Sequence, residues 1–457
     1  MIFFKAWEQK APNFIYIYHW SCRLKWAIGL LPQKMSKYKD TIYALSTPTG
    51  KSALAVIRIS GNQAYKVLKK ITLLKKIKPN KTNLVLLQNK KKIIDQVVAI
   101  YYKAPNSFTG EDVVEINCHG GFAVVNKISN TLSEKGLRLA EPGEFTKRAL
   151  LNNKIDLVKT ESISDLINAE TDKQRELAIK NLSGGLSKFT KKINNEISLV
   201  LANLEALIDF SDEDLPHGLM KKIIEQNKNI VKDIESELKN AKVSKSIREG
   251  IKVAIVGKPN TGKSSFINFI SKKEISIVTD IPGTTTDLVT SSIDIRGFKF
   301  SFFDTAGIRK HTNLIEEIGI KKTKEIMEKA DLNLIFLEKN EKDLYKNIIN
   351  KIFIRSKSDK RLRINKKEGY INISSKTGRG INSLLSQIYK RTIKKTGKEP
   401  ILSRERHIQI MKKILNILKP IDFKSNLDII AYEYREALDL SLEINQKFDI
   451  EKILDII

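Results

Sequence analysis

The segment Gly257–Ser264 has the pattern Gly-x-x-x-x-Gly-Lys-Ser, which contains the residue types that hold nucleotide phosphates. It follows the apolar run Val253–Val256, which predicts a buried strand, and it precedes a helix-forming stretch. Glycines let backbone N–H groups approach the phosphates, Lys263 reaches the β- and γ-phosphates, and Ser264 coordinates magnesium. A chance glycine turn is the alternative, but strand, loop and helix all agree with the motif. The pattern therefore predicts a phosphate-binding loop.

Two segments farther along the chain have residues that contact the metal and the γ-phosphate in G proteins. The polar loop Val278–Thr285 can supply a second hydroxyl to the metal from Thr285. The stretch Phe298–Phe303 predicts a strand that leads into Asp304-Thr-Ala-Gly307. Its carboxylate suits an outer-shell magnesium role, and the glycine N–H can contact the γ-phosphate. A surface turn after a hairpin strand is the alternative for Asp304, but the order and spacing of the segments indicate a G protein.

A base-reading segment is predicted after the strand Ile352–Ile354. The usual guanine-reading pattern is Asn-Lys-x-Asp, and the residues here are Ser356-Lys-Ser-Asp359. Asp359 can accept from guanine N–H groups, whereas Ser356 departs from the pattern. A solvated, Lys-rich loop is the alternative. Ser374-Ser-Lys376, after the predicted strand Tyr370–Ile373, is expected to cover the base, so guanine is favoured over adenine.

The residue after Gly307 is Ile308, where Ras-like enzymes have the glutamine that orients water. A carboxylate of the pair Glu316–Glu317 is the substitute that we predict, and a solvated charge near a helix start is the alternative. We expect Glu316, Lys263 and Asp304 to be catalytic. The predicted nucleotide contacts are Asn260, Thr261, Gly262, Lys263, Ser264, Ser265, Thr279, Asp280, Ile281, Pro282, Gly283, Thr284, Thr285, Asp304, Thr305, Ala306, Gly307, Ser356, Lys357, Asp359, Ser374, Ser375 and Lys376. The predicted magnesium ligands are Ser264 and Thr285.

Periodicity indicates the elements that must position these residues. Strand candidates such as Ala53–Ile59 and Val97–Tyr102 alternate with helical stretches, which predicts an N-terminal α+β domain. Helical spacing begins near Ser162 and returns near residue 397. We therefore expect a Ras-like α/β G domain inserted into one helical domain. The predicted boundaries are 40–155 for the N-terminal domain, 156–249 and 397–457 for the helical domain, and 250–396 for the G domain.

Residues 1–34 contain all three tryptophans and lack a clear period, so we treat 1–39 as an extension outside the fold. Met35 precedes a polar run and a strand candidate, which makes a misplaced start codon the leading explanation. A targeting segment for an organelle is the alternative, because five basic residues accompany the single acid Glu8.

The chain has 457 residues, enough for about three domains. Its 81 Lys and Arg against 52 Asp and Glu give a net charge of +29, which suits polyanions such as RNA, although the even spread of Lys also fits a biased genome.

The sequence lacks an apolar run of eighteen residues, which argues against a membrane span. Cys22 and Cys118 are the only cysteines, which fits a reducing compartment. We expect a cytoplasmic protein, or an organellar one if residues 1–34 are a targeting segment.

Residues 40–457 resemble the tRNA-modification GTPase family known as MnmE or TrmE. The resemblance extends beyond the nucleotide motifs to Arg58-Ile-Ser-Gly61, Pro105-Asn-Ser-Phe-Thr-Gly-Glu-Asp-Val-Val-Glu115, Cys118-His-Gly-Gly121 and Pro142-Gly-Glu-Phe-Thr-Lys-Arg148. It implies an N-terminal domain that binds 5-formyl- or methylene-tetrahydrofolate through Arg58, Glu115 and Lys154. The two cations can pair with an anionic tail while the carboxylate accepts from pterin N–H groups. A structural ion pair is the alternative.

The resemblance also implies a GTPase that potassium stimulates and that dimerises through its G domains. The implied potassium ligands are Asn260, Thr279, Ile281 and Thr284, and Glu316 falls at the family's catalytic glutamate. The implied partners are a second copy of the chain, the flavin-dependent protein MnmG and tRNA, whose wobble uridine is modified at C5. Two departures stand out: Thr286 replaces the family's switch arginine, and the family's Cys-x-Gly-Lys tail is not found, through truncation or loss.

Two other functions compete with this one. An RNA-binding GTPase that acts as an assembly factor would use the basic surface but would not need the folate-like motifs. A nucleotide-binding module with weak turnover would fit Ser356 and the missing tail.

Overall fold

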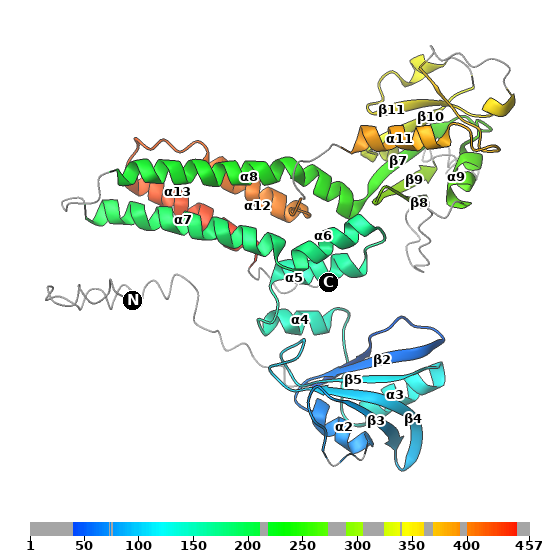
Figure 1. Cartoon of the computed structure of the whole chain (residues 1–457), viewed down its shortest axis with the longest axis vertical. Coiled ribbons are helices and arrows are strands. Elements are labelled where there is room, and N and C mark those ends of the chain that lie inside the picture. The colour runs from blue at the N-terminus through cyan, green and yellow to red at the C-terminus, as the bar shows by residue number, and fades with distance from the viewer. Residues whose placement is uncertain are drawn as a thin grey trace, which may run out of the picture. The chain divides into compact units, whose positions relative to one another are not determined.

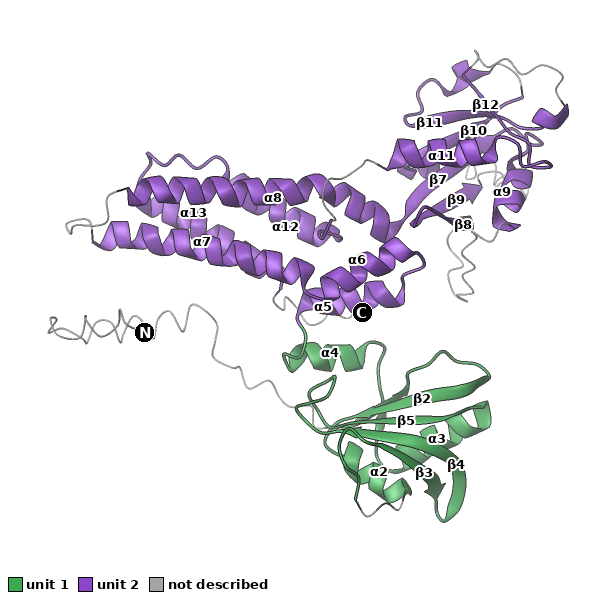
Figure 2. Ribbon diagram, in the orientation of Figure 1, with its two compact units in different colours: residues 1–155 green, residues 156–457 purple. Residues whose placement is uncertain are grey.

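The computed structural model describes residues 40–72, 74, 76–210, 218–272, 289–304, 324–338, 341–360, 369–393 and 400–445. The chain divides into two compact units, Met1–Ile155 and Asp156–Ile457 (Figure 2). Residues 1–34, for which a misplaced start codon or a targeting role is predicted, lie outside the described ranges. Within those ranges, none of the helices combines the length and the apolar character needed to cross a bilayer.

The first unit is a mixed sheet with two helices packed on one of its faces (Figure 1). Six strands lie in the order β3-β4-β5-β2-β1-β6, and all neighbours are antiparallel except β1 and β6. The strands are β1 (Ile42–Leu45), β2 (Ser52–Ser60), β3 (Thr82–Asn89), β4 (Lys92–Tyr102), β5 (Val113–Gly120) and β6 (Arg138–Leu139). The helices are α2 (Ala64–Thr72), α3 (Phe122–Glu134) and α4 (Glu144–Leu151). Alternate residues such as Ile57 and Ile59 of β2 are fully buried beneath α2 and α3.

In the second unit, the G domain contains a doubly wound sheet. Its strand order is β12-β11-β10-β7-β9-β8, with β8 antiparallel and all other pairs parallel. The strands are β7 (Ile251–Gly257), β8 (Val289–Ile295), β9 (Phe298–Asp304), β10 (Leu332–Phe336), β11 (Lys351–Arg355) and β12 (Ile371–Asn372), with helices α9 (Lys263–Lys272) and α11 (Ile381–Thr392). All residues of β10 are buried, as expected for a strand covered on both faces. Because the strands are parallel, the carboxyl ends of β7, β9, β10, β11 and β12 lie at one edge of the sheet.

The helical domain is built from two segments of the chain on either side of the G domain. Its helices are α5 (Leu157–Ile167), α6 (Asp172–Leu182), α7 (Gly185–Asp209) and α8 (Leu219–Glu249), followed by α12 (Glu405–Leu418) and α13 (Leu427–Leu442). One apolar core joins both segments, and it contains Ile197 of α7, Ile234 of α8, Ile414 of α12 and Tyr434 of α13. The expected fold class, an α/β domain inserted into a discontinuous helical domain, is confirmed.

The G-domain sheet begins directly where α8 ends. Gly250 separates α8 from β7 with a φ of 77°, a conformation that favours glycine. Beside this junction, Lys299 of β9 forms a 2.6 Å ion pair with Glu170 ahead of α6. The Gln174 Nε2 of α6 donates to the Arg248 carbonyl oxygen of α8 at 3.0 Å. The sheet is therefore anchored on α6 and α8 at the end opposite to the nucleotide motifs.

Candidate functional site

The phosphate-binding loop lies between β7 and α9, as the motif predicts. Asn260 and Gly262 have positive φ values of 61° and 94°. A Cβ atom at Gly262 would lie 2.5 Å from the Ser356 hydroxyl oxygen, so a larger residue would not fit there. These glycine and asparagine conformations turn the loop so that the chain can enter α9 at Lys263.

The Lys263 side chain lies inside this loop and is only 3% exposed. Its ammonium group donates to the carbonyl oxygens of Gly257 at 2.7 Å and Lys258 at 2.6 Å. These two bonds hold the ammonium group inside the loop. Ser264 and Ser265, in the first turn of α9, are exposed, and an anion beside them would also face the helix N-terminus.

Asp304 is the last residue of β9 and pairs in register with Ile255 of the neighbouring strand β7. The register places this buried carboxylate at the sheet edge that carries the phosphate-binding loop. A serine hydroxyl and a carboxylate are hard oxygen donors, which is the chemistry that Mg²⁺ prefers. Among the described residues, no group of three or more His, Cys, Asp or Glu side chains is placed so that it could hold a metal ion.

The segment after β11 lies against the phosphate-binding loop. The Ser356 hydroxyl donates to the Thr261 carbonyl oxygen at 2.6 Å, and the Lys357 ammonium donates to the Asn260 carbonyl oxygen at 2.8 Å. Ser356 is buried, so its bond stabilises the back of the loop. The serine that departs from the usual guanine-reading pattern therefore contacts the protein backbone.

Asp359 lies beside the loop that is predicted to cover the base. The Ser374 hydroxyl donates to its carboxylate at 2.7 Å, and this bond, followed by a backbone hydrogen bond, holds the pKa of Asp359 below its ordinary value. The carboxylate is therefore ionised at neutral pH and can accept from ligand N–H groups. The Ser375 hydroxyl oxygen is buried without a hydrogen-bond partner in the described ranges, while Lys376 is exposed.

Several predicted site residues lie outside the described residues. They are the first-switch positions Thr279, Asp280, Ile281, Pro282, Gly283, Thr284 and Thr285, the second-switch positions Thr305, Ala306 and Gly307, and the catalytic candidate Glu316. The structure thus brings together the phosphate-binding loop, Asp304 and the base-reading segments of the predicted nucleotide site.

In the first unit, the predicted folate contacts Arg58 and Glu115 face each other across β2 and β5. The Arg58 Nε and Nη2 atoms donate to Glu115 Oε1 at 2.9 and 2.7 Å. The ion pair that the sequence offers as an alternative is therefore present. Lys154 instead donates to the Pro105 carbonyl oxygen at 2.8 Å. Burial first, and then the Glu115 carboxylate, raises the pKa of the nearby Tyr102.

Two aromatic rings lie near the Arg58 guanidinium, and the sequence did not predict a role for either. The guanidinium carbon lies 5.6 Å from the ring centre of Phe108 and 5.8 Å from that of Phe145. Both distances are within the range of cation–π attraction. Both phenylalanines belong to segments that resemble the family, Pro105–Glu115 and Pro142–Arg148. This resemblance was the only feature of the sequence that could have pointed to a role for them.

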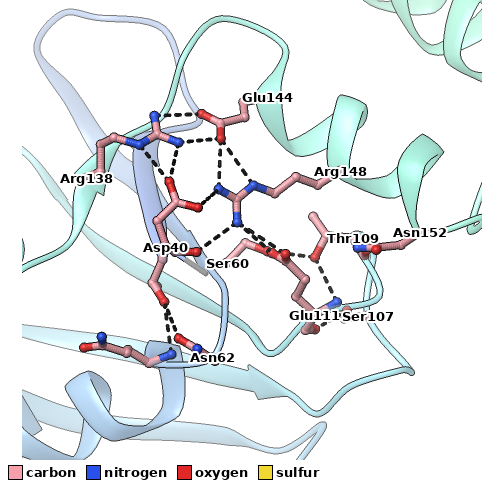
Figure 3. A network of polar contacts seen from close by, with 12 residues as sticks. Asp40, Ser60, Asn62, Ser107, Thr109, Glu111, Arg138, Glu144, Arg148 and Asn152 are labelled. Carbon is pink, nitrogen blue, oxygen red and sulfur yellow. Dashed lines mark hydrogen bonds and ion pairs between the residues drawn. The ribbon is translucent and has the colours of Figure 1, made fainter. Parts of the chain in front are cut away.

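A network of charged groups in the same unit joins Asp40, Glu111 and helix α4 (Figure 3). Arg148 of α4 is fully buried and donates to three carboxylates. They belong to Asp40, Glu111 and Glu144, and the first and third also accept from Arg138. Burial opposes ionisation of Glu144, but hydrogen bonds from Arg138, the Glu141 amide and Arg148 outweigh it and keep the pKa of Glu144 below its ordinary value. Both guanidinium groups are therefore matched with ionised partners.

Known families match almost all of the described chain. Residues 41–154 match the family described as "GTP-binding protein TrmE N-terminus", and residues 157–457 match "MnmE helical domain". The tRNA modification GTPase MnmE of Aquifex aeolicus (strain VF5) is 37% identical over 436 residues, which cover 91% of this chain and 97% of the relative. The protein of the same name from Fervidobacterium nodosum is 38% identical over 449 residues, covering 91% and 96%. A third, from Lactococcus lactis subsp. lactis, is 39% identical over 399 residues, covering 83% and 88%. The resemblance read from the motifs is thus confirmed, and the chain belongs to the tRNA modification GTPase MnmE family.

Proposed function

We propose that this chain hydrolyses GTP, with stimulation by potassium, during modification of C5 of the wobble uridine in tRNA, together with the flavin-dependent protein MnmG. Membership of the family supports GTP hydrolysis and tRNA modification. The observation that carries the proposal is the arrangement of Lys263, held by two neutral carbonyls, beside the carboxyl end of β9 and the base-reading segments.

Lys263 would bind the β- and γ-phosphates of GTP. Two of its acceptors are backbone carbonyl oxygens, and a phosphate oxygen in place of one of them would add an opposite charge beside the ammonium group. Backbone N–H groups at the start of α9 add further donors. Ser264 and Thr285 would ligate Mg²⁺, and Asp304 would hold its outer shell. When bound, Mg²⁺ supplies charge neutralisation at the phosphates.

Asp359 would read guanine through its N–H groups, because the carboxylate is ionised and accepts one hydrogen bond from Ser374. The orphaned Ser375 hydroxyl offers one more polar contact next to this loop. Glu316 would orient or deprotonate the attacking water, since Ile308 has no polar group for that task.

A K⁺ ion would supply charge at the γ-phosphate that an arginine provides in other G proteins. Asn260, the carbonyls of Thr279 and Ile281, and Thr284 are uncharged oxygen donors, which suit a hard monovalent ion. Thr286 stands where an arginine would be expected, so the first switch does not supply this charge itself. In the proposed dimer, the second G domain would pack over these residues.

The N-terminal unit would bind 5-formyl- or methylene-tetrahydrofolate as the source of a one-carbon group. Arg58 and Lys154 would pair with the anionic tail, and Glu115 would accept from the pterin N–H groups. This folate role distinguishes the proposed function from that of a GTPase that only assists RNA assembly.

The test is the GTPase rate and the sedimentation of the full chain with a transition-state mimic, in potassium and in sodium. We expect faster turnover and a dimer in potassium only. Asn260→Ala should remove the potassium response while magnesium-dependent nucleotide binding persists. Equal rates and a monomer in both salts would reject the potassium mechanism. Mass spectrometry of tRNA from a deletion strain then tests the modification: an unchanged wobble uridine would reject the tRNA role.

A further inference from the structure

The segment from Pro105 to Asp112 is fixed to helix α4 and the residues that follow it. The Arg148 Nη1 atom donates to both carboxylate oxygens of Glu111, at 3.3 and 3.2 Å. The Asn152 amide donates to the Thr109 carbonyl oxygen at 2.7 Å. At Gly110, whose φ is 78°, a Cβ atom would lie within 3.3 Å of the Lys154 and Asn152 side chains. The segment and the helix therefore pack closely.

Glu111 is also bonded from within the sheet. The Ser60 hydroxyl at the end of β2 donates to Glu111 Oε2 at 2.7 Å and lies 2.7 Å from the Thr109 hydroxyl (Figure 3). Glu111 thus connects β2, its own segment and α4. Since all five N–H groups of Arg148 have acceptors, this guanidinium has a single well-defined position.

The two joined elements carry the two rings that lie near Arg58. Phe108 belongs to the fixed segment, and Phe145 lies three residues before Arg148 on α4. Arg58 donates to Glu115 from Nε and Nη2, while its Nη1 has no acceptor among the described residues. That edge of the guanidinium is available to an anion.

We propose that Arg148 is a positioning residue for this anion site: through Glu111 it holds Phe108 and Phe145 in place beside Arg58 and so orients the open Nη1 edge. Arg148 itself is fully buried and would not touch the ligand. The inference rests on the proposed function only for the identity of the anion, the carboxylate tail of a folate. A fixed guanidinium binds a carboxylate more tightly than a mobile one, because less side-chain entropy is lost.

Removal of Arg148 would leave Asp40 and Glu144 with Arg138 and would break the ion pair of Glu111, so such a variant is expected to fold poorly. Glu111→Gln is the better test, because it keeps the shape of the side chain and one acceptor oxygen. Asp95→Asn is a matched control. It removes another acid that is paired in the same sheet, with His119 at 2.8 Å, and that is not bonded to Arg58, Glu111 or Arg148 in the described structure.

The probe is 5-formyl-tetrahydrofolate, titrated calorimetrically into the full chain well below the unfolding temperature. We expect Glu111→Gln to weaken binding roughly tenfold and Asp95→Asn to leave it unchanged. Phe108→Leu should also weaken binding. The double variant, Glu111→Gln with Phe108→Leu, should have the same affinity as whichever single variant binds less tightly, because both changes act on Arg58. Additive losses would overturn the proposal, since Glu111 would then act independently of the ring.

A second readout does not depend on the ligand. The full chain is labelled with ¹⁵N-arginine, and the Nε–H signal of Arg58 is identified by its loss in the Arg58→Lys variant. We expect this signal to shift in Glu111→Gln and to stay in place in Asp95→Asn. An unshifted signal would overturn the proposal. If the unmodified chain does not bind the folate, the folate part of the proposed function is wrong, and the Arg58 signal still decides the role of Arg148.

Discussion

Two cations in this chain are predicted to meet anions, and their surroundings differ. Lys263 is 3% exposed and donates to two backbone carbonyl oxygens, whereas the Arg58 side chain is 29% exposed and is paired with Glu115 at 2.7 Å. An anion at Lys263 can replace a backbone carbonyl as acceptor. An anion at Arg58 meets a pair of zero net charge, so the ligand must also offer N–H donors to Glu115. The first site offers an ammonium group and backbone donors to an anion, whereas the second requires a ligand with both donors and acceptors.

The largest effect is expected for Lys263→Ala. One charge-assisted hydrogen bond is worth up to about 3 kcal/mol, so GTP affinity should fall by roughly 100-fold or more. Fluorescence titration with a labelled GTP analogue measures this loss. Lys272→Ala, an exposed lysine in the last turn of the same helix, is the control and should bind normally. Undiminished affinity in Lys263→Ala would reject the phosphate-binding loop.

Glu316→Ala should separate turnover from binding at the same site. We expect GTP affinity to change little and single-turnover hydrolysis to slow roughly 100-fold, the usual scale for loss of a general base or a water-positioning group. Rapid-quench measurement of GDP formation tests this, with Glu317→Ala as the neighbouring control. A wild-type rate in Glu316→Ala would move the role to Glu317 or elsewhere.

Arg58→Lys keeps the charge but removes the planar fork that contacts Glu115 and leaves Nη1 open. We expect about tenfold weaker binding of 5-formyl-tetrahydrofolate in calorimetry. For a reduced pterin without the glutamate tail, the affinity should differ much less between Arg58→Lys and the unmodified chain. Equal losses for the two compounds would show that Arg58 does not bind the tail.

The smallest effect is expected for Ser356→Ala, which removes the hydroxyl that donates to the Thr261 carbonyl at the back of the phosphate-binding loop. Loss of a neutral hydrogen bond costs about 1 kcal/mol, so the dissociation of bound GDP should quicken about fivefold. Stopped-flow release of a fluorescent GDP measures this rate. If Ser356 reads the base instead, discrimination between guanine and adenine nucleotides will change while loop stability does not.

The elements and the nucleotide motifs could be predicted because their signals are local in sequence. The run Val253–Val256 and the glycines after it specify a strand, a turn and a helix within twenty residues. The contacts of Ser356 and Arg148 could not be predicted in this way. Ser356 bonds to a residue 95 positions away, and Arg148 bonds to Asp40, 108 positions away. Such partners depend on which strands and loops become neighbours, and periodicity has no information on that.

The discontinuous helical core can be completed only after the ribosome has synthesised the G domain that interrupts it. The buried amides of Asn181 and Asn227 donate to the carbonyl oxygens of Ile401 and Leu418, which are 220 and 191 positions later. The ribosome must therefore add the whole inserted domain before these bonds can form. At roughly 5–20 residues per second, about 150 residues take on the order of 10 s. For that interval the apolar stripe of α7 is exposed on the nascent chain, and a chaperone that binds apolar helices would compete with α12 and α13 for it.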